Sequence, residues 1–194
     1  MFRKWRELRK DGAMKMVSVD IRNEECLILL KPDCVERHLS GEIIARIEKA
    51  GMLLTRMKLV QASADLIGQH YPDDTSWLKK VGMKKIQKFQ AMGKTVKEDS
   101  LSIGKGVRND LIRYFSGKTI IVFTVQGLNA IACMRKLAGN TEPFSANPGT
   151  LRADYSTDSY ESADSLERPI QNLIHVSDSP ESCQREIEIW FAEK

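Results

Sequence analysis

The segment Asn172-Leu173-Ile174-His175-Val176-Ser177-Asp178-Ser179, close to the C-terminus, is the most informative part of this chain. It places one of only three histidines just before a helix start, with Ser179 as N-cap, Pro180 at the first helical position and Glu181 in the first turn. A helix N-terminus offers unpaired backbone N–H groups and a positive dipole end, which favour phosphate. Imidazole acts as a nucleophile as well as a general base. The segment therefore predicts a histidine that handles phosphate; the alternative is a histidine that only satisfies a structural hydrogen bond.

Length and composition indicate one substantial globular domain. The chain has 194 residues, of which 42% are hydrophobic, and its net charge is +4. This charge is too small to indicate nucleic-acid binding, so none is predicted. The longest apolar run, residues 26–30, is far shorter than the ~18 residues of a membrane span, so no membrane association is predicted either.

Part of the positive charge is concentrated at the start of the chain. Residues 1–15 contain six basic and two acidic side chains, and we assign residues 1–22 to a basic N-terminal extension. A frayed, solvated extension is the preferred interpretation, and an arm that contacts a polyanion or a membrane surface is the alternative. The segment lacks the apolar core of a signal peptide.

The four cysteines show no CxxC spacing, and the histidines are too few and scattered to indicate a zinc site. Without an export signal, the cysteines are interpreted as reduced thiols, because disulfides are rare in the cytosol. The chain is therefore predicted to be cytoplasmic.

The hydrophobic pattern predicts a mixed order of strands and helices. Strands are predicted at residues 25–30, 52–60, 119–125 and 171–176, and helices at residues 40–50, 62–70, 127–137 and 180–192. The lysine-rich region 72–116 is predicted to be a helical insertion, and the polar segment 156–169 a loop insert. The remaining order suits an α+β fold, a ferredoxin-like βαββαβ sandwich with a four-stranded antiparallel sheet and helices on one face. We assign residues 23–194 to this domain.

Side chains suited to phosphate or ribose stand near the predicted connections. They are Lys31, Arg135, Thr141, Arg152, Asn172 and His175. Lysine and arginine neutralise phosphate charge, arginine with a planar bidentate fork. Threonine and asparagine supply neutral hydrogen bonds to phosphate or ribose oxygens. Each residue alone is more often an ordinary solvated side chain, so only their order and spacing can carry a prediction.

Five motifs contain these residues. They are Lys31-Pro32-Asp33, Gly127…Arg135-x5-Thr141-x-Pro143, Ala146-x-Pro148-Gly149-Thr150-x-Arg152-x-Asp154, Asn172-x2-His175-x-Ser177-Asp178-Ser179 and Glu186-Ile187-x-x-Trp190-Phe191. In order and spacing they closely resemble the nucleoside diphosphate kinase family. The resemblance covers roughly residues 25–192, and the Asn-x-x-His-x-Ser-Asp-Ser motif is highly specific to that family.

The resemblance implies a phosphoryl shuttle. A nucleoside triphosphate, mainly ATP, would give its γ-phosphate to His175, and a different nucleoside diphosphate would take it in a ping-pong reaction. A covalent intermediate splits one difficult transfer into two easier ones, while the rest of the site positions groups and spreads charge. The resemblance also implies Mg²⁺ bridging the nucleotide phosphates with few direct protein ligands. It implies a homo-oligomer built from dimers, such as a tetramer or hexamer.

The same resemblance implies the nucleotide-binding residues, which are Lys31, Tyr71, Arg135, Thr141, Arg152 and Asn172. The lysine and the two arginines would neutralise the β- and γ-phosphates. Thr141 would hydrogen-bond the phosphate chain. Asn172 would contact the ribose hydroxyl, which Lys31 is also placed to reach. Tyr71 would shape the site.

The predicted catalytic residues are His175, Glu186, Ser177 and Lys31. Glu186 would accept a hydrogen bond from the His175 nitrogen that does not attack, which fixes the tautomer. Ser177 would assist near the histidine. The alternative for Glu186 is a solvated helix carboxylate. The two other histidines, His38 and His70, are predicted to be ordinary surface or packing residues.

The chain departs from the family pattern at several places. Ala153 stands where the family usually has glycine, and the two inserts lengthen the chain after Tyr71 and before Asn172. The side chain that would clamp the base is consequently not assigned to one residue. The candidates are Trp77, Leu78 and Phe89.

Two other functions stay open at this level. One is a non-catalytic regulatory homologue that binds nucleotide or nucleic acid, which the intact set of site residues argues against. The other is histidine kinase activity towards other proteins.

Overall fold

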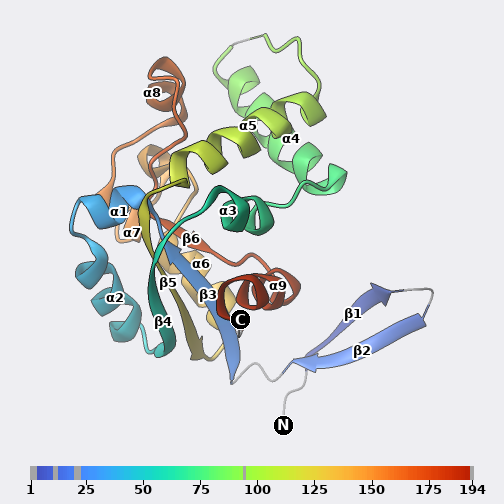
Figure 1. Ribbon diagram of the computed structural model, residues 1–194, viewed down its shortest axis with the longest axis vertical. Coiled ribbons are helices and arrows are strands. Elements are labelled where there is room, and N and C mark those ends of the chain that lie inside the picture. Colours follow the sequence, from blue (N-terminus) through green and yellow to red (C-terminus); the bar gives the residue numbers. More distant parts are fainter. Residues whose placement is uncertain (1–3, 11–12, 20–22, 94, 193–194) are drawn as a thin grey trace.

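The computed structural model describes residues 4–10, 13–19, 23–93 and 95–192. Its strands are β1 (Lys4–Lys10), β2 (Ala13–Val19), β3 (Glu24–Leu30), β4 (Leu53–Gln61), β5 (Thr119–Gly127) and β6 (Ile174–Val176). Its helices are α1 (Pro32–Glu36), α2 (Ser40–Lys49), α3 (Ala64–His70), α4 (Thr75–Ala91), α5 (Ser100–Phe115), α6 (Ala130–Ala138), the 3₁₀ turn η1 (Pro143–Ser145), α7 (Leu151–Tyr155), α8 (Tyr160–Ser165) and α9 (Pro180–Phe191). Figure 1 shows their arrangement.

Strand β3 lies at the centre of the main sheet. Residues 26–30 form a continuous apolar run, and all five are completely buried. The strand pairs antiparallel with β5 on one side and with β6 on the other, and the sheet order is β4-β5-β3-β6. With β4 antiparallel to β5, this is the predicted α+β fold with a four-stranded antiparallel sheet.

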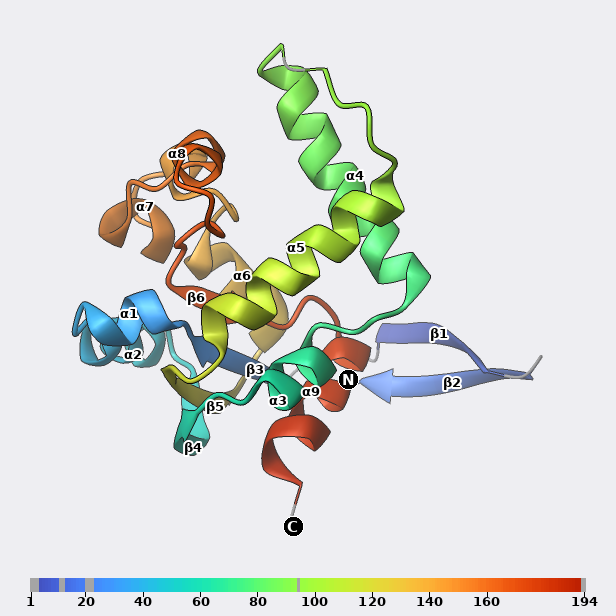
Figure 2. The same cartoon turned by 45° about the horizontal axis from the view of Figure 1, so that its top comes forward.

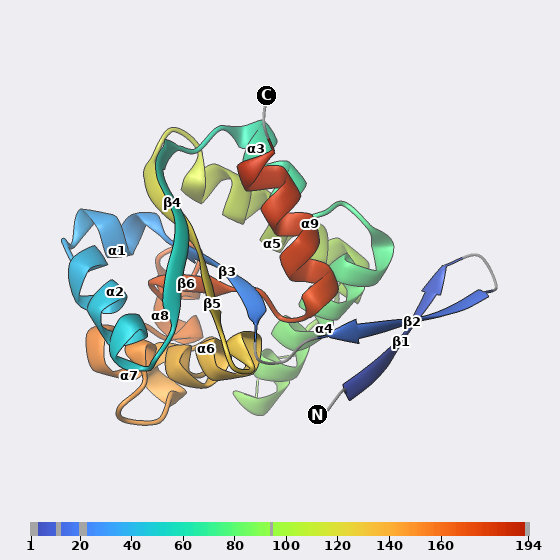
Figure 3. The same cartoon turned by 90° about the horizontal axis from the view of Figure 1, so that it is seen from below.

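Helices cover both faces of this sheet. The sequence predicted helices on one face only; α2 and α6, the two crossover helices, lie on one face, but α3 and α9 cover the other (Figure 3). On that second side, the thiol of Cys183 in α9 lies 3.2 Å from the carbonyl oxygen of Glu25. The second layer explains why consecutive residues of β3 are all buried, because a strand with one free face would alternate.

The region 72–116 contains α4 and α5, which pack directly against each other. A Cβ atom at Gly82 would lie 1.8 Å from the carbonyl oxygen of Ser100, and one at Gly104 would lie 2.1 Å from that of Leu78. Only glycine permits so close an approach of two helix backbones. The pair extends away from the sheet (Figure 2).

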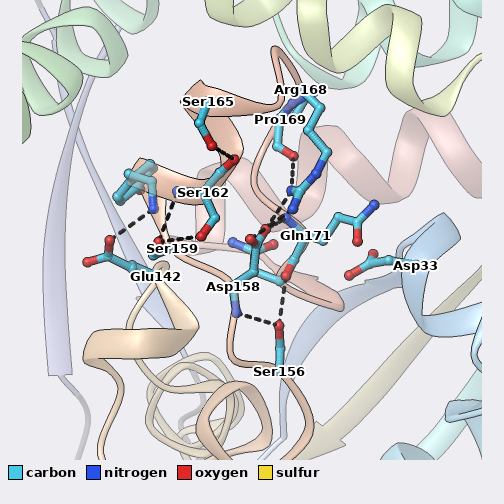
Figure 4. Close-up of polar contacts among 12 residues, drawn as sticks. Asp33, Glu142, Ser156, Asp158, Ser159, Ser162, Ser165, Arg168, Pro169 and Gln171 are labelled. Atoms are coloured by element: carbon cyan, nitrogen blue, oxygen red, sulfur yellow. Dashed lines mark hydrogen bonds and ion pairs between the residues drawn. The ribbon is translucent and has the colours of Figure 1, made fainter.

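The polar segment 156–169 is ordered around helix α8, where we expected a loop. Ser159 caps the helix, its side chain accepting from the backbone N–H of Ser162. Asp158 holds the two ends of the segment together (Figure 4). It forms two hydrogen bonds with the guanidinium of Arg168, at 2.6 and 2.9 Å, and accepts from the backbone N–H of Gln171 at 2.7 Å.

Strands β1 and β2 form a separate antiparallel pair. The expectation of a frayed extension is therefore wrong for residues 4–10 and 13–19, and the remaining residues of the extension up to residue 22 lie outside the described residues. The sequence Asp11-Gly12 between two alternating runs is a hairpin signal, which an argument from charge alone overlooked. In the described part of the chain, none of the helices has the length and apolar composition needed to cross a membrane.

Candidate active site

A cleft of about 1090 Å³ is lined by residues of α4, α5, α8 and β6. Figure 2 shows how these four elements are arranged. The cleft brings together eight residues predicted from the sequence: Lys31, Tyr71, Arg135, Thr141, Arg152, Asn172, His175 and Glu186. Ser177, the remaining predicted residue, is completely buried behind them. These residues come from four elements, α6, α7, β6 and α9, and from the connections between elements, so the cleft exists only in the folded chain.

His175 and Glu186 form a hydrogen-bonded pair that lines the cleft. His175 lies on β6, and its Nε2 is 3.1 Å from Oε1 of Glu186 on α9. The other carboxylate oxygen, Oε2, accepts a hydrogen bond of 2.6 Å from the hydroxyl of Ser177. An ionised carboxylate only accepts, so Nε2 of His175 carries the proton and a neutral ring keeps its lone pair on Nδ1. This arrangement supports the predicted role of Glu186 and gives Ser177 a specific one, which is to hold the carboxylate.

The pKa of Glu186 is low although the residue is buried. Burial raises the pKa, but the charge of His175 and the hydrogen bonds from His175 and Ser177 outweigh it and lower the pKa to about 2. The carboxylate is thus ionised wherever the chain is folded near neutral pH. Because its pKa lies below the ordinary value, it stabilises the fold above that value, and this contribution is lost as the pH falls towards about 2.

The chain beside His175 is held by the Lys31-Pro32-Asp33 motif. The backbone N–H of Lys31 donates to the carbonyl oxygen of Leu173 at 2.9 Å, and Oδ2 of Asp33 accepts from the backbone N–H of Leu173 at 3.0 Å. The hydroxyl of Tyr114 donates to Oδ1 of Asp33 at 2.9 Å. Leu173 has a φ of 68°, an uncommon conformation for a residue with a side chain. Asp33 therefore fixes a strained backbone close to His175.

Arg152 holds the same segment from the other side. Its guanidinium donates to the carbonyl oxygens of Asn172 (3.1 Å), Ile174 (2.6 Å) and Gly139 (2.9 Å). Burial, reinforced by the charge of Arg135, lowers the pKa of Arg152 to about 10. The group remains a cation at neutral pH, so it supplies positive charge to the cleft while it fixes the backbone around His175.

Asn172 presents an unpaired acceptor. Its Nδ2 donates to the carbonyl oxygen of Thr141 at 2.6 Å, whereas its buried Oδ1 has no hydrogen-bond partner among the described residues. A buried acceptor without a partner is unfavourable. The predicted contact with a ribose hydroxyl would satisfy it. Thr141 and Arg135 are exposed at the cleft wall, where nothing blocks the predicted phosphate contacts.

Lys31 is a buried cation that loses its proton more readily than an ordinary lysine. Burial, helped by the charge of Arg152 and opposed by that of Asp33, lowers the pKa of Lys31 to about 8. Its Nζ lies 5.9 Å from the centre of the Phe115 ring.

We expect the affinity for ADP to fall as the pH rises through about 8. At pH 9, the neutral form of a lysine with this pKa outnumbers the charged form by about tenfold. ADP binding that requires the charge should therefore weaken by about tenfold. Calorimetric titration of ADP between pH 7 and pH 9 measures the effect. Lys31→Met should bind more weakly and lose the pH dependence, whereas Lys84→Met, on the same cleft, should keep it. An equal dependence in Lys31→Met would contradict the assignment.

Two arginines hold the end of α3, which carries His70 and Tyr71. The last carbonyl groups of a helix have no donors within the helix. Arg108 of α5 and Arg185 of α9 each donate to two of the four carbonyl oxygens of residues 68–71, at 2.8–3.1 Å. Arg108 lies in the helical insertion, so the insertion helps to position a wall of the cleft.

Aromatic side chains line the part of the cleft formed by α4. Trp77 and Phe89 both lie on it, and the ring of Trp77 is 6.0 Å from that of Tyr71. Leu78 is 1% exposed and packs at the contact between α4 and α5, so it is not a candidate for the base clamp. Trp77 and Phe89 remain.

Comparisons with known proteins agree with this geometry. The family model described as nucleoside diphosphate kinase matches residues 24–96 and 78–194. A nucleoside diphosphate kinase from Pyrobaculum aerophilum is 41% identical over 176 residues, which are 88% of this chain and 96% of that protein. The chain belongs to the nucleoside diphosphate kinase family.

Solved structures extend the similarity to three dimensions. The crystal structure of an NDP kinase from Pyrobaculum aerophilum has a TM-score of 0.84 at 39% identity, covering 88% of this chain and 97% of that one. A nucleoside-diphosphate kinase from Borrelia burgdorferi, described as a transition state mimic with bound vanadate and ADP, has a TM-score of 0.71 at 29% identity and 90% coverage of both chains. The protein is therefore a phosphotransferase that acts on nucleotides.

In the described part of this kinase, the clustered side chains that could hold a metal ion are poorly suited to Mg²⁺. Among the described residues, the candidate cluster of metal ligands is His70, His175 and Glu186. Two of its three ligand atoms are nitrogens, whereas Mg²⁺ prefers oxygen in an octahedral arrangement. Both oxygens of Glu186 are already engaged by His175 and Ser177.

The two inserts of the kinase meet across the mouth of the cleft. Lys88 of α4 pairs with the carboxylate of Glu142, and its Nζ lies 5.4 Å from the centre of the Tyr160 ring on α8. Glu142 also accepts from the backbone N–H of Tyr160 at 3.0 Å. None of these three residues was predicted, because Lys88 and Tyr160 lie in the inserts and Glu142 occupies the unspecified position between Thr141 and Pro143 in its motif.

Proposed function

We propose that this kinase transfers the γ-phosphate of a nucleoside triphosphate, mainly ATP, to nucleoside diphosphates through a phosphohistidine at His175. The supporting observation is the hydrogen bond between Nε2 of His175 and Glu186, which leaves Nδ1 as the nucleophilic nitrogen. The His175 side chain is 20% exposed and lines the cleft, so a nucleotide can reach it.

The chemistry balances without a strong base. The Nδ1 lone pair forms a bond to the γ-phosphorus, the bond from phosphorus to the β–γ bridging oxygen breaks, and the nucleoside diphosphate leaves. A second nucleoside diphosphate then attacks the same phosphorus with a terminal oxygen and restores the lone pair to Nδ1. Lys31, Arg135 and Arg152 neutralise the phosphate charge in both directions. Between the two steps, phosphorus on Nδ1 and the proton on Nε2 give the ring a formal positive charge, which the hydrogen-bonded Glu186 carboxylate offsets.

The remaining features of the family belong to the same proposal. Mg²⁺ arrives on the phosphates of the nucleotide, where it would neutralise charge. Four free thiols suit a reducing cytoplasm. Homo-oligomerisation is supported by β4, an edge strand on which Leu53, Met57 and Leu59 are exposed. Residues 23–194 form the kinase domain, with the insertions at 72–116 and 156–169.

Labelling of the chain with γ-labelled ATP tests the proposal. We expect label on the protein that is lost in acid and survives base, because a phosphoimidazole has this stability. The label should transfer to a second nucleoside diphosphate when one is added. His38→Asn is the matched control, because His38 is exposed and asparagine tolerates its φ of 57°. This variant should label normally. ATP binding without any labelling would reject the shuttle and favour a regulatory nucleotide-binding homologue.

A further inference from the structure

His70 lies against the nucleophile, although its sequence context suggested only packing. It is the last residue of α3 and is 1% exposed. Its ring centre is 4.5 Å from that of His175, and the ring planes meet at 78°. Ring nitrogens of both histidines and a carboxylate oxygen of Glu186 lie within 4.8 Å of one another.

The tautomer of His70 is determined by Trp190. The indole Nε1–H of Trp190, also 1% exposed, donates to Nδ1 of His70 at 3.1 Å. An indole nitrogen can only donate, so Nδ1 must keep its lone pair. A neutral His70 therefore carries its proton on Nε2, and a cationic His70 would place two N–H groups against each other.

Nε2 of His70 has no hydrogen-bond partner among the described residues. Buried donors without acceptors are rare and call for an explanation. Because this nitrogen carries a proton, it cannot serve as a metal ligand, which removes the metal interpretation of the cluster. Contact with a neighbouring π system is the remaining compensation, and the rings of His175 and Tyr71 lie 4.5 and 4.6 Å away.

Helix α9 therefore controls both histidines from one face. Glu186 and Trp190 are four residues apart, which places them on the same side of the helix. Glu186 binds Nε2 of His175 and leaves a lone pair on Nδ1, whereas Trp190 binds Nδ1 of His70 and leaves a proton on Nε2. The nucleophile has its lone pair available, and its neighbour is held in the opposite tautomer.

We propose that His70 is a positioning residue for phosphoryl transfer, a permanently neutral imidazole that Trp190 locks as the Nε2–H tautomer and that holds the ring of His175 edge-to-face. The proposal rests on the proposed role of His175 as nucleophile. In this proposal His70 acts through His175 and does not contact the phosphate itself.

Neutrality is the property that matters. Burial, together with the charges of His175, Arg185 and Lys31, lowers the pKa of His70 to about 3, against the opposing effect of Glu186. Tyr71, the remaining titratable neighbour, is buried with a raised pKa and stays neutral. A protonated His70 would offer Glu186 a second cation and compete with His175 for the carboxylate that sets its tautomer.

The test compares Trp190→Phe with the wild-type chain. Without the indole donor, Nδ1 of His70 no longer has to accept a hydrogen bond, so the Nδ1–H tautomer becomes available, while burial still opposes a positive charge on the ring. We expect the single-turnover rate of His175 phosphorylation in the variant to fall by about threefold or more at pH 7.5, because the ring of His175 is then held less firmly. A wild-type rate in a folded variant would overturn the proposal.

Two replacements of His70 separate positioning from simple packing. His70→Ala removes the ring and should lower the phosphorylation rate by about tenfold or more at unchanged ATP affinity, because only the orientation of His175 is lost. His70→Phe restores an edge-to-face neighbour that cannot titrate. This variant should recover most of the phosphorylation rate and show no additional loss of rate at acidic pH. A wild-type rate in His70→Ala would contradict the positioning role.

Nuclear magnetic resonance of the wild-type imidazole groups needs no variant. We expect the His70 resonances to report the Nε2–H tautomer and to stay constant between pH 5 and pH 8. Resonances that titrate in this range, or an Nδ1–H tautomer, would overturn the proposal even if neither variant folds. Failure of the wild-type chain to label with γ-labelled ATP would instead reject the shuttle through His175, which keeps the two outcomes distinct.

Discussion

Replacement of His175 by alanine is expected to lower the rate of γ-phosphate transfer by about 10⁴-fold or more, and to abolish labelling of the chain. The reason is that the shuttle has no other route. In the proposed shuttle the Nδ1 lone pair of His175 receives the phosphoryl group, and Glu186 and Ser177 behind it orient the ring.

The measurement is a steady-state assay of transfer from ATP to a second nucleoside diphosphate, with label on the protein followed in parallel. The variant should still bind ADP, because Arg152 and Lys31 are retained. Glu186→Gln gives a graded comparison, since the amide still contacts His175 but no longer fixes one tautomer. Full activity in His175→Ala would reject the phosphohistidine mechanism.

Replacement of Arg152 by methionine is expected to affect both stability and catalysis. The guanidinium donates to three backbone carbonyl groups that lie close to or within the segment around His175. Removing it takes a donor from all three acceptors, although the carbonyl oxygen of Asn172 keeps the backbone N–H of Ile174 as a partner. At about 1 kcal/mol for each lost bond, the free energy of unfolding should fall by about 2–3 kcal/mol. The loss of the phosphate-neutralising charge should lower the phosphorylation rate by about 100-fold.

Denaturant unfolding measures the first effect and single-turnover labelling the second. Arg46→Met is the matched control, because Arg46 also bonds to a carbonyl oxygen and a carboxylate, those of Gly149 and Asp154, but lies outside the cleft. It should change stability by no more than about 1 kcal/mol and leave the rate unchanged. Equal effects of the two substitutions would show that Arg152 has no special role.

Local patterns predicted the main elements because their causes are local. The apolar run of residues 26–30 requires a strand buried on both faces, and Ser179-Pro180 requires a helix start, which is where α9 begins. The hairpin of β1 and β2 and the helix α8 were missed although each had a local signal. The first has Asp11-Gly12 between its strands, and the second has Ser159 as N-cap.

The hydrogen bonds that support the site could not be predicted from the sequence, because they join residues far apart in the chain. Asp33 bonds to Leu173, 140 residues away, and Trp190 bonds to His70, 120 residues away. A side chain in such a pair has no periodicity or spacing that reveals its partner. Arg108 and Arg185, which hold the end of α3, were hidden for the same reason.

The sequence by itself determined the order of the main strands and helices, the family and eight of the residues that line the cleft, because these depend on short motifs and on the alternation of apolar side chains. Only the tertiary structure decided the protonation of the site. Which nitrogen of His175 is basic, why His70 stays neutral and why Lys31 holds its proton weakly all depend on burial and on the groups that folding brings within hydrogen-bonding distance. The pKa shifts of Lys31 and His70 and the preferred tautomer of His175 are lost in the unfolded chain, where neither the burial nor these partners exist.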